Sequence, residues 1–281
     1  MLEIQQVSFA YPGHAPALKE LSLTVAAGDF IGLAGRNGSG KTTLTRIMVG
    51  LAKPVSGQVL LDGRNTLQCG PAVMARAIGY VFQNPDRQIF RDTVAQEVAF
   101  GPEQMDWSDN ERTQAVADAL RMTGLESVAA AYPRGLTRSF RQRIAIASAL
   151  ALKPRLLILD EPTSGQDAEE KSQLMKLLDE LNQQGIGIIL VTHDMELLLA
   201  HTRRAVVLHQ GEKVFDGLTD ELFAATTATK VSEWGLRVPD VAAVAAKLKN
   251  PLGAVRTVEQ LADRIEGQLR GDEGEKSGAP V

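Results

Sequence analysis

The pattern of apolar residues along the chain predicts short strands that alternate with helices. Residues 2–9 and 18–25 alternate apolar and polar positions, which is typical of strands with one buried face. Other runs are continuously apolar, as expected of strands buried on both faces; they cover residues 30–34, 78–82, 156–159 and 186–191. Because helical segments separate these runs, the pattern predicts a mostly parallel α/β sheet with antiparallel strands beside it.

Helical periodicity appears between the strands and dominates the end of the chain. The predicted helices cover residues 43–48, 93–100, 108–123, 139–152, 168–184, 195–200, 240–249 and 257–269. Ser108 with Glu111, and Thr257 with Gln260, have the spacing of capping boxes, in which side chain and backbone bond reciprocally at a helix start. The dipeptide Gln210-Gly211 between two short apolar segments predicts a hairpin.

These elements divide the chain into two folded parts and a tail. We expect an α/β domain over residues 1–222, with a helical insert at about 84–152. A small helical extension should follow over residues 223–270. Residues 271–281 are polar and rich in glycine, so we expect them to be disordered.

Composition limits the possible classes of protein. The chain has 281 residues, 44% of them hydrophobic, which is ample for a packed core. Its net charge of −4 gives no reason to expect nucleic acid as a partner, although a local basic patch stays open. A single cysteine, Cys69, excludes an internal disulfide. The N-terminus lacks signal-peptide features and the apolar runs fall short of the ~20 residues of a membrane span, so any membrane role should come through a partner.

The stretch from Gly35 to Thr42 reads Gly-Arg-Asn-Gly-Ser-Gly-Lys-Thr and fits the P-loop pattern G-x-x-x-x-G-K-[ST]. It lies between a predicted strand and a predicted helix, where backbone N–H groups and the helix N-terminus favour phosphate. Lys41 should reach the β- and γ-phosphates of ATP, and Thr42 should ligate Mg²⁺. A chance glycine-rich turn is the alternative. The expected nucleotide-binding residues here are Asn37, Gly38, Ser39, Gly40, Lys41, Thr42 and Thr43.

Two acidic residues, Asp160 and Glu161, end the apolar run at 156–159. After a P-loop this is the Walker B arrangement, in which Asp160 holds Mg²⁺ and Glu161 orients or polarises the attacking water. A strand that ends in two solvated acids is the alternative.

The order of P-loop, helical insert, Asp-Glu and then Thr192-His193-Asp194 resembles the ATPase subunits of ABC transporters over about residues 1–222. That resemblance implies a P-loop NTPase (RecA-like) core with an antiparallel β subdomain, a helical ABC subdomain and a soluble ATPase with ATP and Mg²⁺. It also implies that Tyr11 stacks on adenine, Gln83 touches Mg²⁺ or the attacking water, and His193 contacts the γ-phosphate. Packing of Tyr11 in a turn, loop capping by Gln83 and a structural His193 are the alternatives.

Residues 83–90 and 93–102 resemble more narrowly the ATPases of energy-coupling-factor importers of vitamins and metal ions, the cobalt-type group. Residues 234–239 resemble that group's C-terminal extension, which helps to hold two ATPase subunits together; a merely stabilising appendage is the alternative. The resemblance implies a peripheral position on the cytoplasmic face of the cell membrane. It also implies a transmembrane scaffold protein, a separate substrate-binding membrane protein and no nucleic acid.

The chain departs from the family at its signature loop, which usually reads Leu-Ser-Gly-Gly-Gln, any residue, Gln-Arg. Residues 136–143 read Leu-Thr-Arg-Ser-Phe-Arg-Gln-Arg, so the altered positions are Thr137, Arg138, Ser139 and Phe140. In the family this loop contacts the γ-phosphate of ATP on the opposite subunit, where close approach needs glycine. Residues 164–167 read Ser-Gly-Gln-Asp where the family usually has Ser-Ala-Leu-Asp, so the D-loop aspartate, Asp167, remains.

These departures predict that the chain is one half of an ATPase pair. The second subunit is then a different ATPase with a normal signature. Arg138 would then impair the second site, or would replace the lost contacts as an arginine finger does. The expected function is ATP hydrolysis that powers an energy-coupling-factor importer. The alternatives are another ABC transporter class, a regulatory ABC subunit with weak hydrolysis, and a soluble ABC ATPase of translation or DNA repair.

Overall fold

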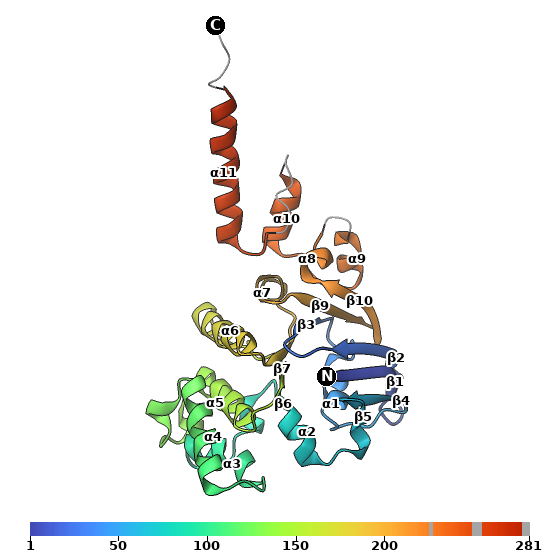
Figure 1. Cartoon of the computed structure of the whole chain (residues 1–281). Coiled ribbons are helices and arrows are strands. Elements are labelled where there is room, and N and C mark those ends of the chain that lie inside the picture. The colour runs from blue at the N-terminus through green and yellow to red at the C-terminus, as the bar shows by residue number, and fades with distance from the viewer. Residues whose placement is uncertain (225–226, 249–254, 277–281) are drawn as a thin grey trace.

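The computed structural model describes residues 1–224, 227–248 and 255–276, which form two sheets surrounded by helices (Figure 1). One sheet is antiparallel, with strand order β2-β1-β4-β5. Its strands are β1 (Leu2–Ala10), β2 (Pro16–Val25), β4 (Ser56–Leu61) and β5 (Arg64–Asn65). Leu18, Leu21, Leu23 and Val25 of β2 are all buried, so the alternation in the sequence identified the face that packs against the core.

The second sheet has six strands in the order β10-β9-β3-β8-β7-β6. They are β3 (Phe30–Ala34), β6 (Ile78–Val81), β7 (Leu156–Asp160), β8 (Gly187–Val191), β9 (Arg204–His209) and β10 (Glu212–Leu218). The pairs from β6 to β9 are parallel, and β10 pairs antiparallel with β9. Every residue of β3, β7 and β8 is buried, which confirms the predicted parallel sheet with both faces covered.

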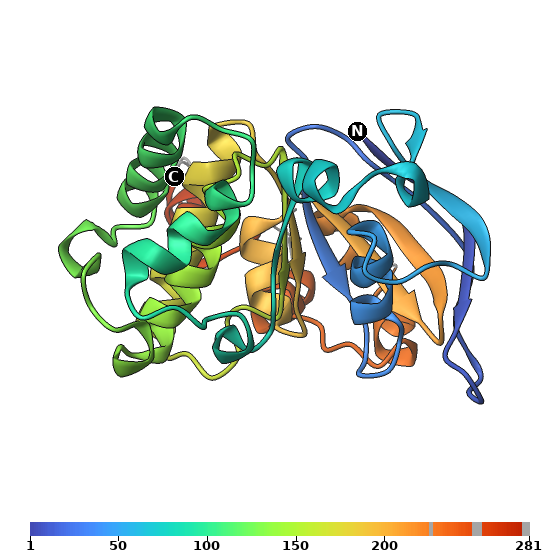
Figure 2. The same cartoon turned by 90° about the horizontal axis from the view of Figure 1, so that it is seen from below.

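Helices separate the two sheets on one side and form a distinct group on the other. Helices α1 (Lys41–Met48) and α2 (Pro71–Ala77) share a hydrophobic core with both sheets. Helices α3 (Val94–Glu103), α4 (Asp109–Met122) and α5 (Arg138–Leu150) form the group at the left of Figure 2. Together with α6 (Ala168–Gln183) they build a second core against the other face of the parallel sheet. Helix α7 (Met195–His201) follows β8.

The structure confirms one of the two predicted capping boxes and contradicts the other. Ser108 and Glu111 form the expected capping box at α4. At α11 (Val258–Lys276), Gln260 donates its backbone N–H to Thr257 Oγ1 at 3.2 Å, but its side chain accepts from Arg256 N at 3.0 Å. The predicted bond between the Gln260 side chain and the Thr257 backbone N–H is therefore wrong, because that side chain accepts from the backbone of Arg256 instead.

The C-terminal helices share a core with the parallel sheet. They are α8 (Thr219–Leu222), α9 (Ala228–Glu233), α10 (Asp240–Lys247) and α11, and α10 and α11 rise above the body in Figure 1. Val231, Leu236 and Val241 of this part pack in one cluster with Ala34 and Val207 of the sheet. The segment is thus bound to the parallel sheet by apolar burial.

The end of the chain corrects one expectation. Helix α11 continues to Lys276, beyond residue 271 where we expected the disordered tail to begin. A single glycine costs a helix only about 1 kcal/mol, so Gly271 does not end it. Residues 277–281 of the predicted tail, and residue 249 of the predicted helix at 240–249, lie outside the described residues.

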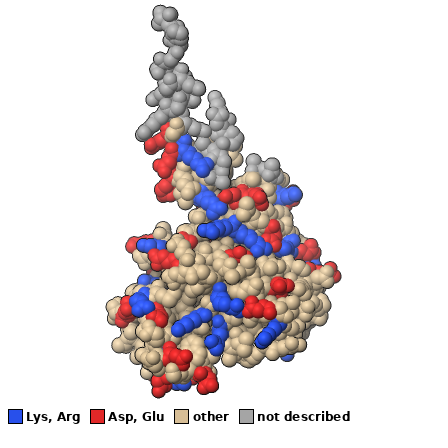
Figure 3. Space-filling view, in the orientation of Figure 1, with Lys and Arg blue, Asp and Glu red and all other residues tan. Residues whose placement is uncertain are grey.

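Two surface properties bear on possible partners. None of the helices in the described ranges is long and apolar enough to cross a membrane. On the face shown in Figure 3, basic and acidic side chains are interspersed over the body, which agrees with a net charge near zero.

A buried carboxylate fixes helix α3 to the loop before it. Glu97 is only 3% exposed, and its Oε2 accepts hydrogen bonds from the backbone N–H groups of Phe90 and Arg91, both at 2.8 Å. These bonds hold Phe90 at the surface, where its ring meets Phe100 edge to face with 4.9 Å between centroids. The position of this aromatic pair therefore depends on Glu97.

Replacing Glu97 by Ala should lower the free energy of unfolding by about 2–3 kcal/mol, because two backbone donors lose a charged acceptor. Glu103→Ala, on the same helix but exposed, is the matched control and should change stability by less than about 0.5 kcal/mol. Urea unfolding followed by circular dichroism measures both. Equal losses in the two variants would show that the Glu97 bonds contribute nothing specific.

Candidate functional site

The carboxyl ends of four parallel strands meet at one edge of the six-stranded sheet. Ligand sites in open α/β sheets lie at this edge, because the loops that leave the strands converge there. Strand β3 leads into the P-loop, β6 into Gln83, β7 into Asp160 and Glu161, and β8 into His193. The pairs Asp160↔Val191 and Leu33↔Val191 put the ends of β7, β8 and β3 level with one another. Residues far apart in the sequence thus form one site.

The P-loop wraps the start of helix α1 and holds the side chain of Lys41. Gly40 has φ of 106°, and a Cβ there would lie 2.6 Å from the Ala17 carbonyl oxygen, so only glycine fits. No side chain caps α1, which leaves first-turn N–H groups available to an anion. The Lys41 ammonium donates to the carbonyls of Gly35 at 2.7 Å and Arg36 at 3.1 Å. Burial lowers the pKa of Lys41, although Glu161 and Asp160 oppose the shift.

Thr42 and Asp160 offer two oxygen atoms suited to a divalent cation. Thr42 Oγ1 donates to Asp160 Oδ2 at 3.0 Å, and the Tyr80 hydroxyl donates to the same oxygen at 3.3 Å. Burial raises the pKa of Asp160, although these two hydrogen bonds oppose the shift. Burial likewise raises the pKa of Tyr80 to about 12, so its hydroxyl remains a donor. Hydroxyl and carboxylate oxygens are ligands that Mg²⁺ accepts, so this donor set fits the expected ion.

The other predicted catalytic residues, Gln83 and His193, lie next to the carboxylate of Glu161. Its Oε2 accepts from Gln83 Nε2 at 2.8 Å and from Ser164 Oγ at 3.4 Å, and His193 Nδ1 lies 3.5 Å away. Glu161 itself has φ of 47°, a left-handed conformation that residues other than glycine rarely adopt. Its backbone N–H donates to the Val191 carbonyl at 2.9 Å. This strained residue turns the chain at the point where the strand leaves the sheet.

A cavity of about 380 Å³ lies among most of these groups, although neither Asp160 nor His193 lines it. The predicted residues that line it are Tyr11, Asn37, Gly38, Gly40, Lys41, Thr42, Thr43, Gln83 and Glu161. The Tyr11 hydroxyl is 3.1 Å from Thr43 Oγ1, and its ring meets Phe9 edge to face. Ser39 is 4% exposed and does not line the cavity. An ammonium, free helix N–H groups and a hydroxyl–carboxylate pair around one cavity fit a nucleotide phosphate chain with its cation.

The altered signature residues separate into two pairs. Thr137 caps helix α5, which begins at Arg138, and both side chains are exposed. Ser139 is buried, and Phe140 packs against the core under the guanidinium of Arg143, 4.7 Å from the ring centroid. Of the two residues that replace the family's glycines, Arg138 is therefore the exposed one and Ser139 the buried one.

The Arg138 side chain lies against the second departure from the family pattern. A Cβ on Gly165 would be 3.4 Å from Nη1 of Arg138, so the two unusual positions are in contact. Two residues along, Asp167 caps helix α6, where its Oδ1 accepts from Glu170 N at 2.8 Å.

Two residues of the site, Tyr80 and Ser164, were not predicted from the sequence. Tyr80 sits in a strand that we expected to be uniformly apolar, yet its hydroxyl contacts Asp160 and Thr45. Ser164 joins the Glu161 cluster. A hydroxyl inside an otherwise apolar strand was the available signal for Tyr80, whereas nothing in the sequence distinguishes Ser164 from a turn residue.

Known proteins similar to this chain agree on one family. The family described as "ABC transporter" matches residues 18–164. A putative ABC transporter ATP-binding protein of Pyrococcus horikoshii is 39% identical over 263 residues, covering 93% of this chain and 98% of that protein. The energy-coupling factor transporter ATP-binding protein EcfA2 of Methanospirillum hungatei JF-1 is 40% identical over 230 residues, covering 80% of this chain and 57% of that protein.

Two solved structures of ATP-binding proteins also resemble this chain. CbiO1 of Clostridium perfringens, described as part of the ABC transporter complex cbiONQ, has a TM-score of 0.75 and 33% identity, covering 86% of this chain and 97% of that one. A dimeric ATP-binding cassette in a post-hydrolysis state with ADP and Pi has a TM-score of 0.68 and 29% identity, covering 78% and 99%. Some relatives are longer: this chain spans 36% and 38% of two putative ABC transporter ATP-binding proteins from Methanosarcina acetivorans and Methanosarcina mazei.

Two aspartates should respond to pH with opposite signs in the nucleotide-free protein. The folded pKa of Asp160 is raised, so its contribution to stability is present below its unfolded pKa and is lost as pH rises through the folded value. Asp160→Asn should therefore be more stable than the wild type at pH 7, with the difference shrinking toward pH 4. Chemical unfolding across this range measures it.

Asp62 is the control, because a hydrogen bond from Arg155 lowers its pKa. Its contribution is present at pH 7 and is lost as pH falls through the folded pKa, so Asp62→Asn should be less stable than the wild type at pH 7. The effect should be small, since this pair is about half exposed. Destabilisation by Asp160→Asn at pH 7 would contradict the assigned cost of burial.

Proposed function

Because this chain belongs to the ABC transporter family of ATP-binding domains, we propose that it binds and hydrolyses ATP to power an energy-coupling-factor importer of a vitamin or metal ion. The convergence of Gln83 and His193 on Glu161, beside an uncapped P-loop helix, carries the proposal. Its relatives EcfA2 and cbiO1 support the transporter class.

The P-loop binds the phosphates through groups that are already aimed at the cavity. Lys41 exchanges the carbonyls of Gly35 and Arg36 for phosphate oxygens, and the α1 N–H groups complete the cradle. Tyr11 lines the far side of the cavity and stacks on adenine. Loop and helix positions are fixed before binding, which limits the entropy lost when the nucleotide binds.

Thr42 and Asp160 would hold Mg²⁺, and Gln83, which lines the same cavity as Thr42, would reach it through water. The ion, when bound, neutralises charge that develops on the phosphate oxygens. Ionised Asp160 is disfavoured by burial in the nucleotide-free protein, and a divalent cation would reverse that preference.

Glu161 orients the attacking water and accepts its proton as the water oxygen bonds to the γ-phosphorus and the bond to the β–γ bridging oxygen breaks. Gln83 and His193 hold the carboxylate and the water in line. The strained backbone of Glu161 supports this role, since strain persists where a side chain must be aimed.

The altered signature supports an asymmetric pair of ATPases. This chain supplies Lys41, Asp160, Glu161 and His193 to one site, and a different subunit supplies a normal signature to it. The second site receives Arg138 instead of a small residue, and this impairs close approach to phosphate. Residues 223–270 then contribute to holding the pair together.

A regulatory subunit that binds ATP but hydrolyses it weakly is the second candidate, and the exposed Arg138 favours it. Arg138 also permits the opposite role, donation to the γ-phosphate of the partner's ATP. Under the asymmetric proposal Arg138→Ala leaves turnover unchanged or raises it. A fall in turnover would assign Arg138 the donor role.

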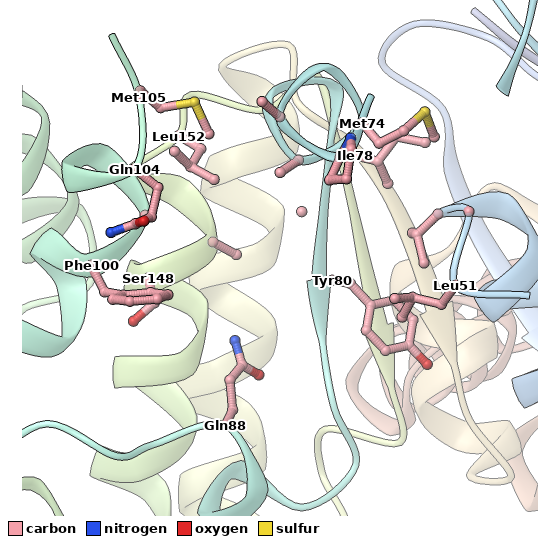
Figure 4. Close-up of a pocket in the computed structure, with 18 of the residues that line it drawn as sticks. Leu51, Met74, Ile78, Tyr80, Gln88, Phe100, Gln104, Met105, Ser148 and Leu152 are labelled. Atoms are coloured by element: carbon pink, nitrogen blue, oxygen red, sulfur yellow. The ribbon is translucent and has the colours of Figure 1, made fainter. Parts of the chain in front are cut away.

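An apolar groove suits a membrane partner. A cavity of about 840 Å³ separates the α3–α5 group from α2, as Figure 4 shows, with Phe100 and Leu152 on one side and Met74 and Leu51 on the other. We assign it to a cytoplasmic segment of the transmembrane scaffold protein, which places this subunit peripherally on the cytoplasmic face of the membrane. Solute recognition then belongs to the separate substrate-binding membrane protein.

Glu161→Gln should lower MgATP hydrolysis by about 10²- to 10⁴-fold while MgATP binding is retained, since the variant loses the base and keeps the phosphate cradle. Phosphate release and calorimetric titration measure the two. Glu169→Gln, on an exposed turn of α6, is the control and should leave both unchanged.

The same variant tests the asymmetry once the partner ATPase is mixed in. Glu161→Gln should abolish most turnover of the pair, whereas the equivalent change in the partner should have a small effect. Equal losses from the two changes would overturn the asymmetric pair and leave the ATPase assignment standing.

Phe90→Asp should release the protein from membranes that contain its partners, because it puts a charge on the exposed apolar edge of the groove. Val55→Asp, at a residue even more exposed than Phe90 but outside the groove, should stay bound. Sedimentation of membrane vesicles measures the bound fraction, and MgATP affinity should be unaffected in both variants. Retention of Phe90→Asp would exclude this groove as the docking site.

A further inference from the structure

The C-terminal extension touches the P-loop directly. A Cβ on Gly235, at the end of α9, would lie 2.2 Å from Cδ and 2.9 Å from Cγ of Arg36. Arg36 is the first variable residue of the P-loop, and no carboxylate in the described ranges forms an ion pair with it. Its side-chain stem therefore rests on the bare backbone of the extension.

The turn that makes this contact is rigid. Leu236 N donates to the Val231 carbonyl at 3.0 Å and Gly235 N donates to the Ser232 carbonyl at 2.9 Å, which together form a Schellman motif. Gly235 has the positive φ, 70°, that this motif requires. Val231 and Leu236 are buried in the cluster that also contains Ala34, the residue before the P-loop. The turn is thus anchored to the strand that carries the loop.

The other end of Arg36 faces the catalytic lysine. Its carbonyl oxygen accepts from the Lys41 ammonium at 3.1 Å and from Ser39 N at 3.1 Å. Arg36 therefore makes both contacts, with Gly235 through its side chain and with Lys41 through its carbonyl oxygen. We expect displacement of the Arg36 side chain to shift the carbonyl that holds the ammonium in place, because both groups belong to one residue.

We propose that the turn at residues 234–236 is a positioning element of the nucleotide site, which fixes Arg36 and through it the resting position of Lys41. This inference rests on the nucleotide binding proposed above. Binding of a nucleotide draws Lys41 away from the Arg36 carbonyl, so the turn also responds to occupancy of the site. Trp234 lies beside Gly235 and is one of two tryptophans in the chain, which makes it a reporter.

A double-mutant cycle separates positioning from simple stability. Gly235→Ala should weaken MgADP binding by about threefold or more, because it displaces Arg36, and Arg36→Ala should weaken it similarly. In the Arg36→Ala background, Gly235→Ala should add no further loss of affinity. The loss of thermal stability that Gly235→Ala causes should appear in both backgrounds, since alanine at positive φ is strained whether or not the Arg36 side chain is present. Titration calorimetry and thermal unfolding give the two readouts.

Two further variants sharpen the cycle. Gly235→Asn tolerates positive φ but keeps the clash, so stability should recover relative to alanine while affinity stays low. Arg36→Lys retains the Cγ and Cδ atoms that rest on Gly235 and should bind MgADP as the wild type does. Additive losses of affinity from Gly235→Ala and Arg36→Ala would overturn the proposal.

Tryptophan emission tests the reverse direction of the coupling. With Trp107→Phe in place, MgADP should shift the emission of Trp234, and Arg36→Ala should abolish the shift at saturating nucleotide. An unchanged shift would contradict the coupling. Failure of the wild type to bind MgADP would instead overturn the proposed function itself, so the two failures are distinguishable.

Discussion

The site depends on the parallel pairing of β6, β7, β8 and β3, which brings the ends of four strands to one edge. Hydrogen bonds between parallel strands fix the relative height of their ends, so Asp160 pairs beside Val191 and Thr192 N reaches the Leu33 carbonyl at 3.2 Å. A shift of one strand would move a catalytic side chain by a residue length, about 3.3 Å. Both faces of this sheet are buried, which makes such a shift costly.

Burial at that edge leaves the protein with charged groups that its own contacts compensate only in part. Desolvation lowers the pKa of Lys41 and raises that of Asp160, so both charged forms are disfavoured, and Glu161 holds a strained backbone. A phosphate chain with its cation offers the opposite charge to each group. A ligand that binds only the folded state also stabilises it, so the same residues link the ATPase cycle to the stability of the fold.

Two contacts between an arginine and a glycine join separate elements of the chain. Arg138 lies on Gly165, and Arg36 lies on Gly235. In each case an arginine side chain covers the backbone of a glycine, and at Gly235 a Cβ would clash with the arginine. The first pair faces the proposed partner subunit, and the second joins the extension to the phosphate loop. Arg138 and Gly165 stand out in the sequence as unusual positions, but nothing there indicates the contact of Arg36 with Gly235, because a lone glycine in a turn has many possible reasons.

The sequence by itself determined the longer helices, the two sheets and most residues of the site, because periodicity and the P-loop and Asp-Glu motifs are local patterns. It did not predict the short helices α2, α8 and α9. It gave no access to the Tyr80 and Ser164 contacts, the inward packing of Phe140, or the helix that runs past Gly271. Those depend on residues that approach from other elements, and local patterns hold no information about them. Only the tertiary structure decided that the extension lies next to the P-loop. Residues more than a hundred positions apart, such as Ala34 and Val231, share one apolar core, and that core holds the extension there.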